Sequence, residues 1–553
     1  MFQRRLLLSS LFVFSLAFSS CGGGVDFAAH YSDSGLIPEN FLPADAGMLI
    51  SYSLRDADQY TAVQAIEAQL GDAGRLSRTF ADQFDSSFKD VGLEYERDLQ
   101  PAFGDQFRFV YAARMVGSDT SETTPETFSV VTLQDPSRLE SVLQVLVDAT
   151  QLEEKTIEST KVYVNNEQGF YATVEGDLLL LASTADNLMT MVNQDSGDSL
   201  WGSDDYQSAL EDVEGGQVLY AMLFPAHYLG GVEVPGVFSL SDIPSIIDHQ
   251  TLVVRAEDTG LQFQAFVNAN KSKAKEADVS FDQIPHAAPY LFEEVPADDL
   301  LAYFESYGLK QALQEAEKLG SGDTLAALRE NARSYLGMDF DEDILSFLDK
   351  GYALALHANG EGLFPGITVY VDVSSNPEKA KELMDKMDGQ LSGLIAVFEA
   401  SLPGAFVKDT VDVDGATLSR VTIDLSTIPR GEDTPLPTSI TDSPVQLVYG
   451  IKDDRMILST ATEISRAEMI SDSDLYKNLN AKLEGVDEGL LLVDAQEIAD
   501  FAANLRALRE QLGLGVSEGA TTFEDFLKGF EGLIAKSHSN AYDSLFSGYL
   551  ELK

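Results

Sequence analysis

The chain has 553 residues, of which 90 are acidic and 37 basic, and its formal net charge is −53. A charge of this sign repels nucleic acids and anionic lipid headgroups, so the composition excludes DNA and RNA as partners. Hydrophobic residues make up 44% and aromatic residues 9% of the chain. That is enough to build cores, so the acidity does not indicate disorder, and the length predicts two or more domains.

The first 20 residues have the layout of an export signal. Arg4 and Arg5 precede an apolar run at 6–18, and two serines follow before Cys21. This order predicts a signal peptide over residues 1–20. The apolar run is too short to span a bilayer as a helix, which takes about 20 residues. Because Cys21 is the only cysteine in the chain, no intramolecular disulfide can form.

A sole cysteine directly after such a segment resembles the signal of bacterial lipoproteins. The resemblance implies that Cys21 is acylated and that the signal is cut just before it. Phe18 stands where these signals usually carry Leu, Val or Ile, and a plain secretory signal with an incidental cysteine is the alternative. Residues 21–37 begin with this cysteine and three glycines, so they are expected to form a flexible, lipid-anchored tether.

The same resemblance predicts where the protein resides. We expect it in the cell envelope, bound to a membrane through the lipid on Cys21 and facing the periplasm or the exterior. Such lipoproteins are commonly retained at the inner membrane by Asp after the cysteine, whereas this chain has Gly22. In an organism with two membranes, the outer membrane is therefore expected.

Five sequence blocks occur twice in the same order. The first, "FLPADAGMLISY" at 41–52, returns as "EVPADDLLAYFE" at 294–305. The other four pairs are 98–113 with 343–358, 128–146 with 367–385, 171–184 with 448–461, and 206–221 with 476–495. Recurrence in one order predicts two copies, at 38–290 and 291–553. The Pro-, Thr- and Ser-rich stretch 428–444 is expected to be an exposed loop of the second copy.

Helices are predicted from apolar periodicity. In 137–151 the apolar residues recur on one helical face, and in 377–402 such a face continues for several turns. Pro136 and Pro377 lie near the starts of these helices, where a missing N–H costs nothing. In copy one, 98–113 is expected to be a short acidic helix, a turn and an apolar strand.

Hairpins complete the pattern. Turns are expected at 176–177, at 258–260 and at 453–454, each between apolar segments typical of strands. Hairpins joined by helices with one apolar face favour antiparallel sheets. We therefore predict an α+β fold made of two similar tandem copies, each a largely antiparallel sheet with helices packed over one face.

The motif "LPAD" at 42–45, the hairpin "EGDLLLLAST" at 175–184 and the duplication together carry a further resemblance. The chain resembles a family of bacterial envelope lipoproteins known only as a domain of unknown function, over nearly the whole mature length. The resemblance brings no agreed catalytic residues. In "LPAD", Pro43 and Asp45 are expected to form a turn and a cap before the first strand.

Local signatures of most enzyme classes are missing from the sequence. The only thiol is assigned to the anchor, there is no GxSxG elbow and no phosphate loop, and neither Gly360-x-Gly362 nor Gly513-x-Gly515 has the third glycine of a dinucleotide fingerprint. The histidines are not spaced for a helical metal site, and they are His30, His227, His249, His286, His357 and His538. We interpret His357 as a core or edge histidine. Trp201 is interpreted as a core residue beneath a connection, with a binding surface as the alternative.

One acidic segment partly matches a calcium-binding loop. In "DFDEDILSFLDK" at 339–350, Asp339, Asp341 and Asp343 occupy the first three ligand positions of a calcium loop. Position six is Ile344 instead of Gly, and position twelve is Lys350 instead of Glu. The segment is therefore interpreted as a helix start, with acid near the positive end of the helix dipole.

Three classes of function follow from these observations. The preferred prediction is a non-enzymatic, lipid-anchored envelope protein with a binding or structural role and a partner such as an envelope protein or a glycan. The alternatives are a carrier of hydrophobic ligands and a hydrolase that uses scattered carboxylates. No cofactor, metal site or catalytic residue is predicted, and Cys21 is the one candidate site residue, for lipidation.

Overall fold

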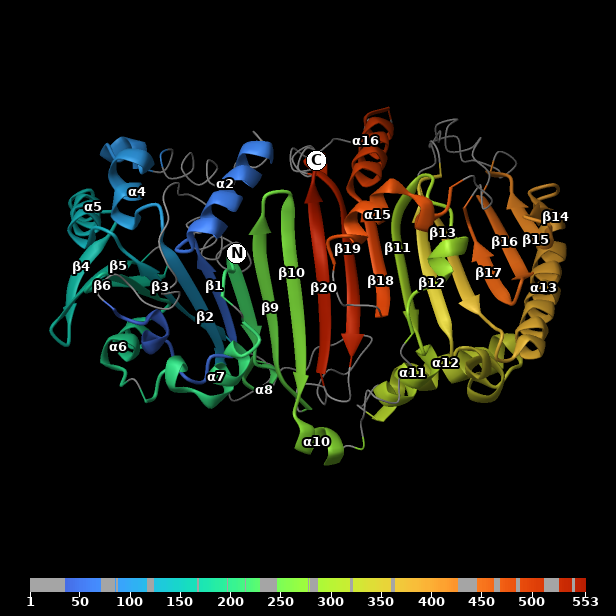
Figure 1. Ribbon diagram of the computed structural model, residues 1–553, viewed down its shortest axis with the longest axis horizontal. Coiled ribbons are helices and arrows are strands. Elements are labelled where there is room, and N and C mark those ends of the chain that lie inside the picture. The colour runs from blue at the N-terminus through green and yellow to red at the C-terminus, as the bar shows by residue number, and fades with distance from the viewer. Residues whose placement is uncertain are drawn as a thin grey trace. The chain divides into compact units, whose positions relative to one another are not determined.

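The computed structural model (Figure 1) describes most of the chain from residue 35 onward. The described residues are 35–70, 85, 88–116, 124–166, 169–195, 197–213, 215–228, 246–276, 278, 287–318, 322–359, 364–425, 445–461, 468–483, 488–511, 527–539 and 543–553. The chain divides into two compact units, Met1–Lys273 (unit 1) and Ala274–Lys553 (unit 2). No described helix is both long and apolar enough to cross a membrane.

Unit 1 contains one antiparallel sheet. Its strands are β1 (Met48–Ser53), β2 (Arg108–Val116), β3 (Thr124–Thr132), β4 (Glu153–Ile157), β5 (Thr160–Asn165), β6 (Phe170–Glu175), β7 (Leu178–Ala182), β8 (Leu219–Leu223), β9 (Ile247–Glu257) and β10 (Gly260–Ala269). Strand pairing gives the order β4-β5-β6-β7-β3-β2-β1-β8-β9-β10. Its helices and helical turns are η1 (Pro38–Phe41), α2 (Ala57–Leu70), η2 (Lys89–Val91), η3 (Tyr95–Leu99), α4 (Gln100–Phe103), α5 (Pro136–Asp148), α6 (Ala185–Asn193), η4 (Leu200–Gly202), α7 (Asp204–Leu210) and α8 (Pro225–Tyr228). A short helix, α10 (Lys271–Glu276), follows β10.

Unit 2 repeats this plan. Its strands are β11 (Leu300–Tyr307), β12 (Gly351–His357), β13 (Gly366–Asp372), β14 (Phe406–Val413), β15 (Ala416–Ile423), β16 (Val445–Lys452), β17 (Arg455–Ser459), β18 (Glu488–Asp494), β19 (Phe530–Ser539) and β20 (Asp543–Leu552). Their order is β14-β15-β16-β17-β13-β12-β11-β18-β19-β20. Its helices and helical turns are η6 (Leu291–Glu294), α11 (Leu309–Lys318), α12 (Gly322–Asn331), η7 (Ala332–Leu336), η8 (Phe340–Ile344), η9 (Leu345–Phe347), α13 (Pro377–Glu399), η11 (Ile470–Asp472), α15 (Asp474–Asn480) and α16 (Ala495–Gln511).

The strand order is therefore the same in both units when each strand of unit 1 is matched to the strand ten positions later in unit 2. The prolines of the two "PAD" segments, at 43–45 and 296–298, agree with this match. Pro43 forms an isolated bridge with Ser199 and Pro296 forms one with Met469, each just before a 3-10 turn. The predicted α+β fold of two similar, largely antiparallel copies is confirmed. The exact copy boundaries, 38–290 and 291–553, stay predictions.

Local sequence explains why the paired elements start where they do. In α5, Asp135 caps the helix by accepting a hydrogen bond from the Arg138 backbone, and in α13 Asn376 accepts one from the Lys379 backbone. Both helices carry proline in the first turn, as predicted. All three predicted hairpins are present, at β6–β7, β9–β10 and β16–β17.

Helices contribute to cores on both faces of the unit 2 sheet. Tyr370 belongs to a core with η6, η11 and α15, whereas its neighbour Val371 belongs to a second core with Leu383 and Met384 of α13. Adjacent residues of a strand point to opposite faces, so the helix-covered face expected from the sequence is joined by a second. In unit 1, the core includes residues of α6, η4 and α7 packed with the central strands.

Candidate functional site

Several sequence-based candidates lie outside the described residues. These are Cys21 with its signal and the tether as far as residue 34, His30, His286, the loop 428–444 and the glycine pairs at 360–362 and 513–515. Lipidation of Cys21 therefore stays a prediction. The acidic segment at 339–350 and the other four histidines are described, and so are two clusters of buried polar residues.

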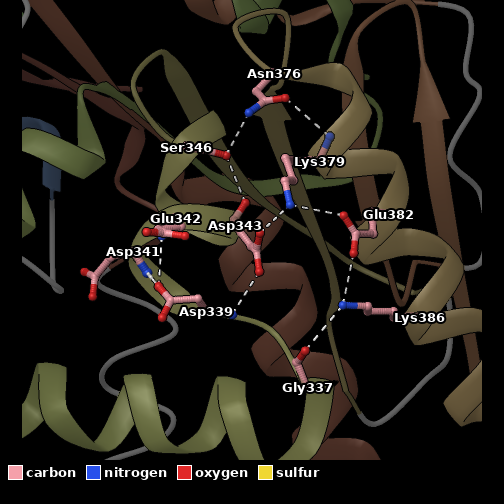
Figure 2. Close-up of polar contacts among 10 residues, drawn as sticks. All are labelled: Gly337, Asp339, Asp341, Glu342, Asp343, Ser346, Asn376, Lys379, Glu382 and Lys386. Carbon is pink, nitrogen blue, oxygen red and sulfur yellow. Dashed lines mark hydrogen bonds and ion pairs between the residues drawn. The ribbon is translucent and has the colours of Figure 1, made fainter.

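The acidic segment forms the start of the helical turn η8 (Figure 2). Asp339 caps the turn, because one of its carboxylate oxygens accepts hydrogen bonds from the backbone N–H groups of Asp341 and Glu342, both at 3.0 Å. Asp343 reaches back and accepts a bond from the Asp339 backbone at 2.9 Å. These carboxylates bind backbone N–H groups, which is the cap arrangement expected from the sequence.

Cations from α13 hold the same turn. Lys379 donates to Asp343 at 2.5 Å and lies 3.3 Å from Glu382, which is also paired with Lys386 at 3.2 Å. The hydrogen bond from Lys379, with the backbone bond from Asp339, holds the pKa of the Asp343 carboxyl below its ordinary value. Within the part of the chain that the structure describes, no group of three His, Cys, Asp or Glu side chains is placed to hold a metal ion. The Asp339 and Asp343 carboxylates are bound by backbone N–H groups and by Lys379, as the helix-start interpretation predicts.

Unit 1 has part of this polar arrangement at the equivalent place, where Arg138 of α5 donates to the Arg97 carbonyl instead of to a carboxylate and the N-cap residue, Glu94, does not cap the turn with its side chain. Asp98, the counterpart of Asp343 in the repeat, accepts a bond from the Glu94 backbone at 2.9 Å. Its pKa is lowered by the hydrogen bond from Arg97, helped by that backbone bond and by the charge of Arg138. Arg138 follows the helix-start proline at the same spacing as Lys379 in unit 2. The polar feature that recurs between the copies therefore joins a helical turn to the next helix.

The most deeply buried charges lie in unit 1. Arg108 of β2 and Glu39 of η1 are 1% and 0% exposed, and the two terminal guanidinium nitrogens of Arg108, Nη1 and Nη2, donate to the two carboxylate oxygens of Glu39. The remaining Arg108 nitrogen donates to Ser51 of β1 at 3.2 Å. The Arg108 guanidinium thus bridges β1, β2 and the turn that precedes β1.

Two tyrosines complete this cluster. The hydroxyl groups of Tyr206 and Tyr220 donate to one oxygen of Glu39 at 2.9 and 3.0 Å. Burial raises the pKa of Tyr220 to about 12 and raises that of Tyr206 well above its ordinary value. Burial lowers the pKa of Arg108, but the adjacent Glu39 carboxylate outweighs this, and the net shift is upward. Arg108 thus stays charged and the phenols neutral.

In unit 2 a different residue performs the equivalent task. Glu305 of β11 is 2% exposed and accepts hydrogen bonds from the backbone N–H groups of Tyr290, Leu291 and Phe292 at 2.7, 2.9 and 3.2 Å. Those groups lie at the start of η6, the turn that corresponds to η1. In both units a buried carboxylate therefore ties the turn before the first strand to the sheet, although it comes from the turn in one unit and from the strand in the other.

The described histidines and the sole tryptophan each contact other residues of their own unit. His357 is buried, with Nδ1 3.3 Å from the backbone oxygen of Asp298, and His249 Nε2 lies 3.1 Å from Asp212. His227 and His538 are each 3.2 Å from a carboxylate. Trp201 is partly buried against the unit 1 core and contacts the ring of Tyr206. These positions agree with the structural interpretation of His357 and Trp201.

Comparison with known proteins gives a family without a function. A family model described as "Protein of unknown function (DUF3352)" matches residues 7–512. The chain belongs to this family. No curated protein matches the chain at a significant level, so membership in DUF3352 assigns no activity, ligand or catalytic residue.

Solved structures with some likeness to this DUF3352 protein are crystal forms of TP0453. Crystal form IV matches with a TM-score of 0.24 and 7% sequence identity, covering 42% of this chain and 81% of that one. Crystal form I matches with a TM-score of 0.23 and 8% identity, covering 42% of this chain and 78% of that one. Values this low support no inference about the function.

Sequence patterns alone do not identify Glu39, Arg108 and Glu305 as buried residues. Glu39 and Arg108 are 69 positions apart, and in a chain with 90 acidic residues nothing local marks one glutamate as buried. The available signal was weak: Arg108 is a cation inside a segment otherwise typical of an apolar strand, and a buried cation requires a partner.

Proposed function

We propose that this DUF3352 protein is a lipid-anchored protein of the bacterial cell envelope with a binding or structural role and no catalytic activity. The observation that carries the proposal is the N-terminal sequence, where a charged start, an apolar run and two serines lead directly to the sole cysteine, Cys21. Two or more acyl chains on one cysteine are enough for stable anchoring. The proposed location is the outer membrane where the organism has two membranes.

The buried charges support a role without catalysis. Glu39 accepts four hydrogen bonds, from Arg108, Tyr206 and Tyr220, and these residues are all buried. Glu305 is likewise bound by three backbone N–H groups and by the hydroxyl of Tyr303. A general acid or base must reach its substrate, and these carboxylates are directed at the protein itself. Their geometry serves to hold the fold.

A partner is part of the proposal. An anchored protein is concentrated near other envelope components, so even a weak contact is effective there. The proposed partners are an envelope protein or a glycan, and the net charge of −53 argues against nucleic acid. Crosslinking in intact cells followed by purification should recover such a partner. A carboxylate pair whose substitution abolishes a measured turnover would instead establish the hydrolase alternative.

The anchor is tested by metabolic labelling with a fatty-acid analogue. We expect the wild-type chain to carry the label and to fractionate with membranes, and Cys21→Ala to lose the label and leave the membrane fraction. Gly23→Ala is the matched control, because it changes the same short segment without removing the thiol, and it should keep the label. Unchanged membrane retention of Cys21→Ala would show that the lipid anchor is wrong.

One observation favours the carrier of hydrophobic ligands as a second candidate. Phe304, Leu354 and Ile367 are exposed on one face of neighbouring strands β11, β12 and β13, since Phe304 is paired with Leu354, and Leu356 with Ile367. An exposed apolar stripe of this kind suits an apolar ligand. Organic extraction of the purified protein followed by mass spectrometry should find bound lipid if this candidate is right, and Leu354→Asp should then release it.

A further inference from the structure

Helix α13 is much longer than its counterpart in unit 1. It spans Pro377–Glu399, 23 residues, whereas its counterpart α5 spans Pro136–Asp148, 13 residues. The buried residues of α13 all belong to its first half, and they are Ala380, Leu383 and Met384. In the second half, Leu391 and Ile395 still pack against the core, whereas Leu394 and Val397 lie on a side of the helix that is exposed.

The side of α13 that meets η7 and η8 continues uncovered toward the C-terminal end. Along that side, Lys379 contacts Asp343, Lys386 contacts the Gly337 carbonyl and Gln390 contacts the Tyr335 carbonyl. One turn further on, the same helical side presents Leu394 and Val397, which are 53% and 67% exposed. Helical spacing of three to four residues places these positions in one row.

Charge is absent from this part of the chain. Residues 389–398, "GQLSGLIAVF", contain no charged residue, although 23% of the whole chain is charged. Phe398, which is 45% exposed, stacks on Phe406 at the start of β14, with ring centroids 5.3 Å apart. The end of α13 is therefore an uncharged apolar tip, defined here by Leu394, Val397 and Phe398, on an otherwise strongly acidic protein.

We propose that this apolar tip inserts into the interfacial region of a neutral lipid bilayer. Amphipathic helices with Leu and Phe on one side bind bilayers in this way, with the apolar side buried at the headgroup boundary. A second copy of the chain is a poor occupant because two surfaces of charge −53 repel each other. A zwitterionic bilayer has no net charge. The inference deepens the proposed function, on which it rests, by giving the anchored protein a second membrane contact.

The sole cysteine makes the test specific. In a Cys21→Ser background of the full chain, Val397→Cys creates one thiol for an environment-sensitive fluorophore. On phosphatidylcholine vesicles, its emission should shift to the blue and be quenched by a lipid-borne quencher. Ala396→Cys is the control and should not respond, because Ala396 is exposed and lies two residues from both Leu394 and Phe398, so it faces away from them on the helix. Anionic phosphatidylglycerol vesicles should give a weaker response because of the net charge.

The outcomes separate this inference from the anchor. Because Cys21→Ser removes the acylation site, the result does not depend on whether Cys21 is acylated. Leu394→Asp combined with Val397→Cys should raise the lipid concentration needed for the fluorescence change about tenfold or more, since burying one such side chain is worth more than a factor of ten. Equal responses at 396 and 397, no response on vesicles, or a response that depends on protein concentration without vesicles would each overturn the proposal.

Discussion

At the scale of single residues, the Glu39–Arg108 pair determines how firmly η1 is bound to the unit 1 sheet. Taking two charges out of water is costly, so the pair as a whole adds little net stability. Removing one partner is different, because the other charge is left buried without compensation. The cost of that step is about 3–5 kcal/mol.

We therefore expect Glu39→Gln to lower the free energy of unfolding of unit 1 by about 3–5 kcal/mol, measured by urea denaturation. The matched comparison is Tyr206→Phe, which removes one donor to Glu39 and should cost about 1 kcal/mol. Glu39→Met combined with Arg108→Leu should recover most of the loss, since it removes both charges. A loss for Glu39→Gln no larger than that for Tyr206→Phe would contradict this account.

A second residue gives the protein a pH-dependent stability. Burial raises the pKa of Glu67, on α2, from 4.5 to about 7. Burial also raises the pKa of the Tyr52 phenol, and the charge of Glu67 adds to that increase. The folded state thus holds the Glu67 proton more tightly than the unfolded state. The stabilising effect is complete below about pH 4.5 and is lost as the pH rises through 7.

Glu67→Gln should consequently be more stable than the wild type at pH 8 and equal to it near pH 4.5. The full shift corresponds to about 3 kcal/mol, but the carboxyl group is partly open to water, so we expect about 1 kcal/mol. Thermal unfolding at the two pH values measures this. Glu140→Gln, exposed on α5, is the control, and a pH-independent effect of Glu67→Gln would refute the assignment.

At the scale of secondary-structure elements, the η8 turn depends on its cap. Asp339→Ala removes the acceptor of two backbone N–H groups and should lower stability by about 1 kcal/mol. Glu342→Ala, at the exposed neighbouring position, should have little effect. Because the carboxylates already bind backbone and Lys379, millimolar calcium should leave the thermal midpoint of the wild type unchanged. A calcium-dependent rise in the wild type that Asp339→Ala abolishes would restore the calcium-loop alternative.

Elements defined by local chemistry were predictable from the sequence, and those defined by distant partners were not. The hairpin at 453–454 is an example of the first kind, because Asp453 and Asp454 both take positive φ angles, 47° and 60°, which Asp tolerates better than most residues. The starts of α5 and α13 were marked by Pro136 and Pro377. In contrast, the carboxylate that holds the unit 2 turn comes from a strand, as Glu305, and not from the turn itself. Predicting this residue requires knowledge of which strand lies beneath the turn.

At the scale of the whole molecule, the net charge of −53 acts on both units. Self-repulsion among like charges destabilises compact states, and salt screens it over about 10 Å at 0.1 M. Raising sodium chloride from low to moderate concentration should thus increase stability by about 1 kcal/mol, or about 2–4 °C in the thermal midpoint of a unit of this size. Potassium chloride at equal ionic strength should act alike. A midpoint that falls or stays constant with salt would contradict the prediction.

The clamp of η1 by Arg108 also has a mechanical consequence for the proposed anchored form. Residues 21–37 lie between Cys21 and the clamped turn, which begins at Pro38. Fully extended, they reach at most about 60 Å, which sets the greatest height above the bilayer at which the fold can be held. A pulling force from the lipid would reach Leu36, which packs against the unit 1 core, and then Glu39, whose bonds lead through Arg108 in β2 to Ser51 in β1. The load would therefore meet the central strands β1 and β2, whereas β4 lies at one end of the sheet order, away from these contacts.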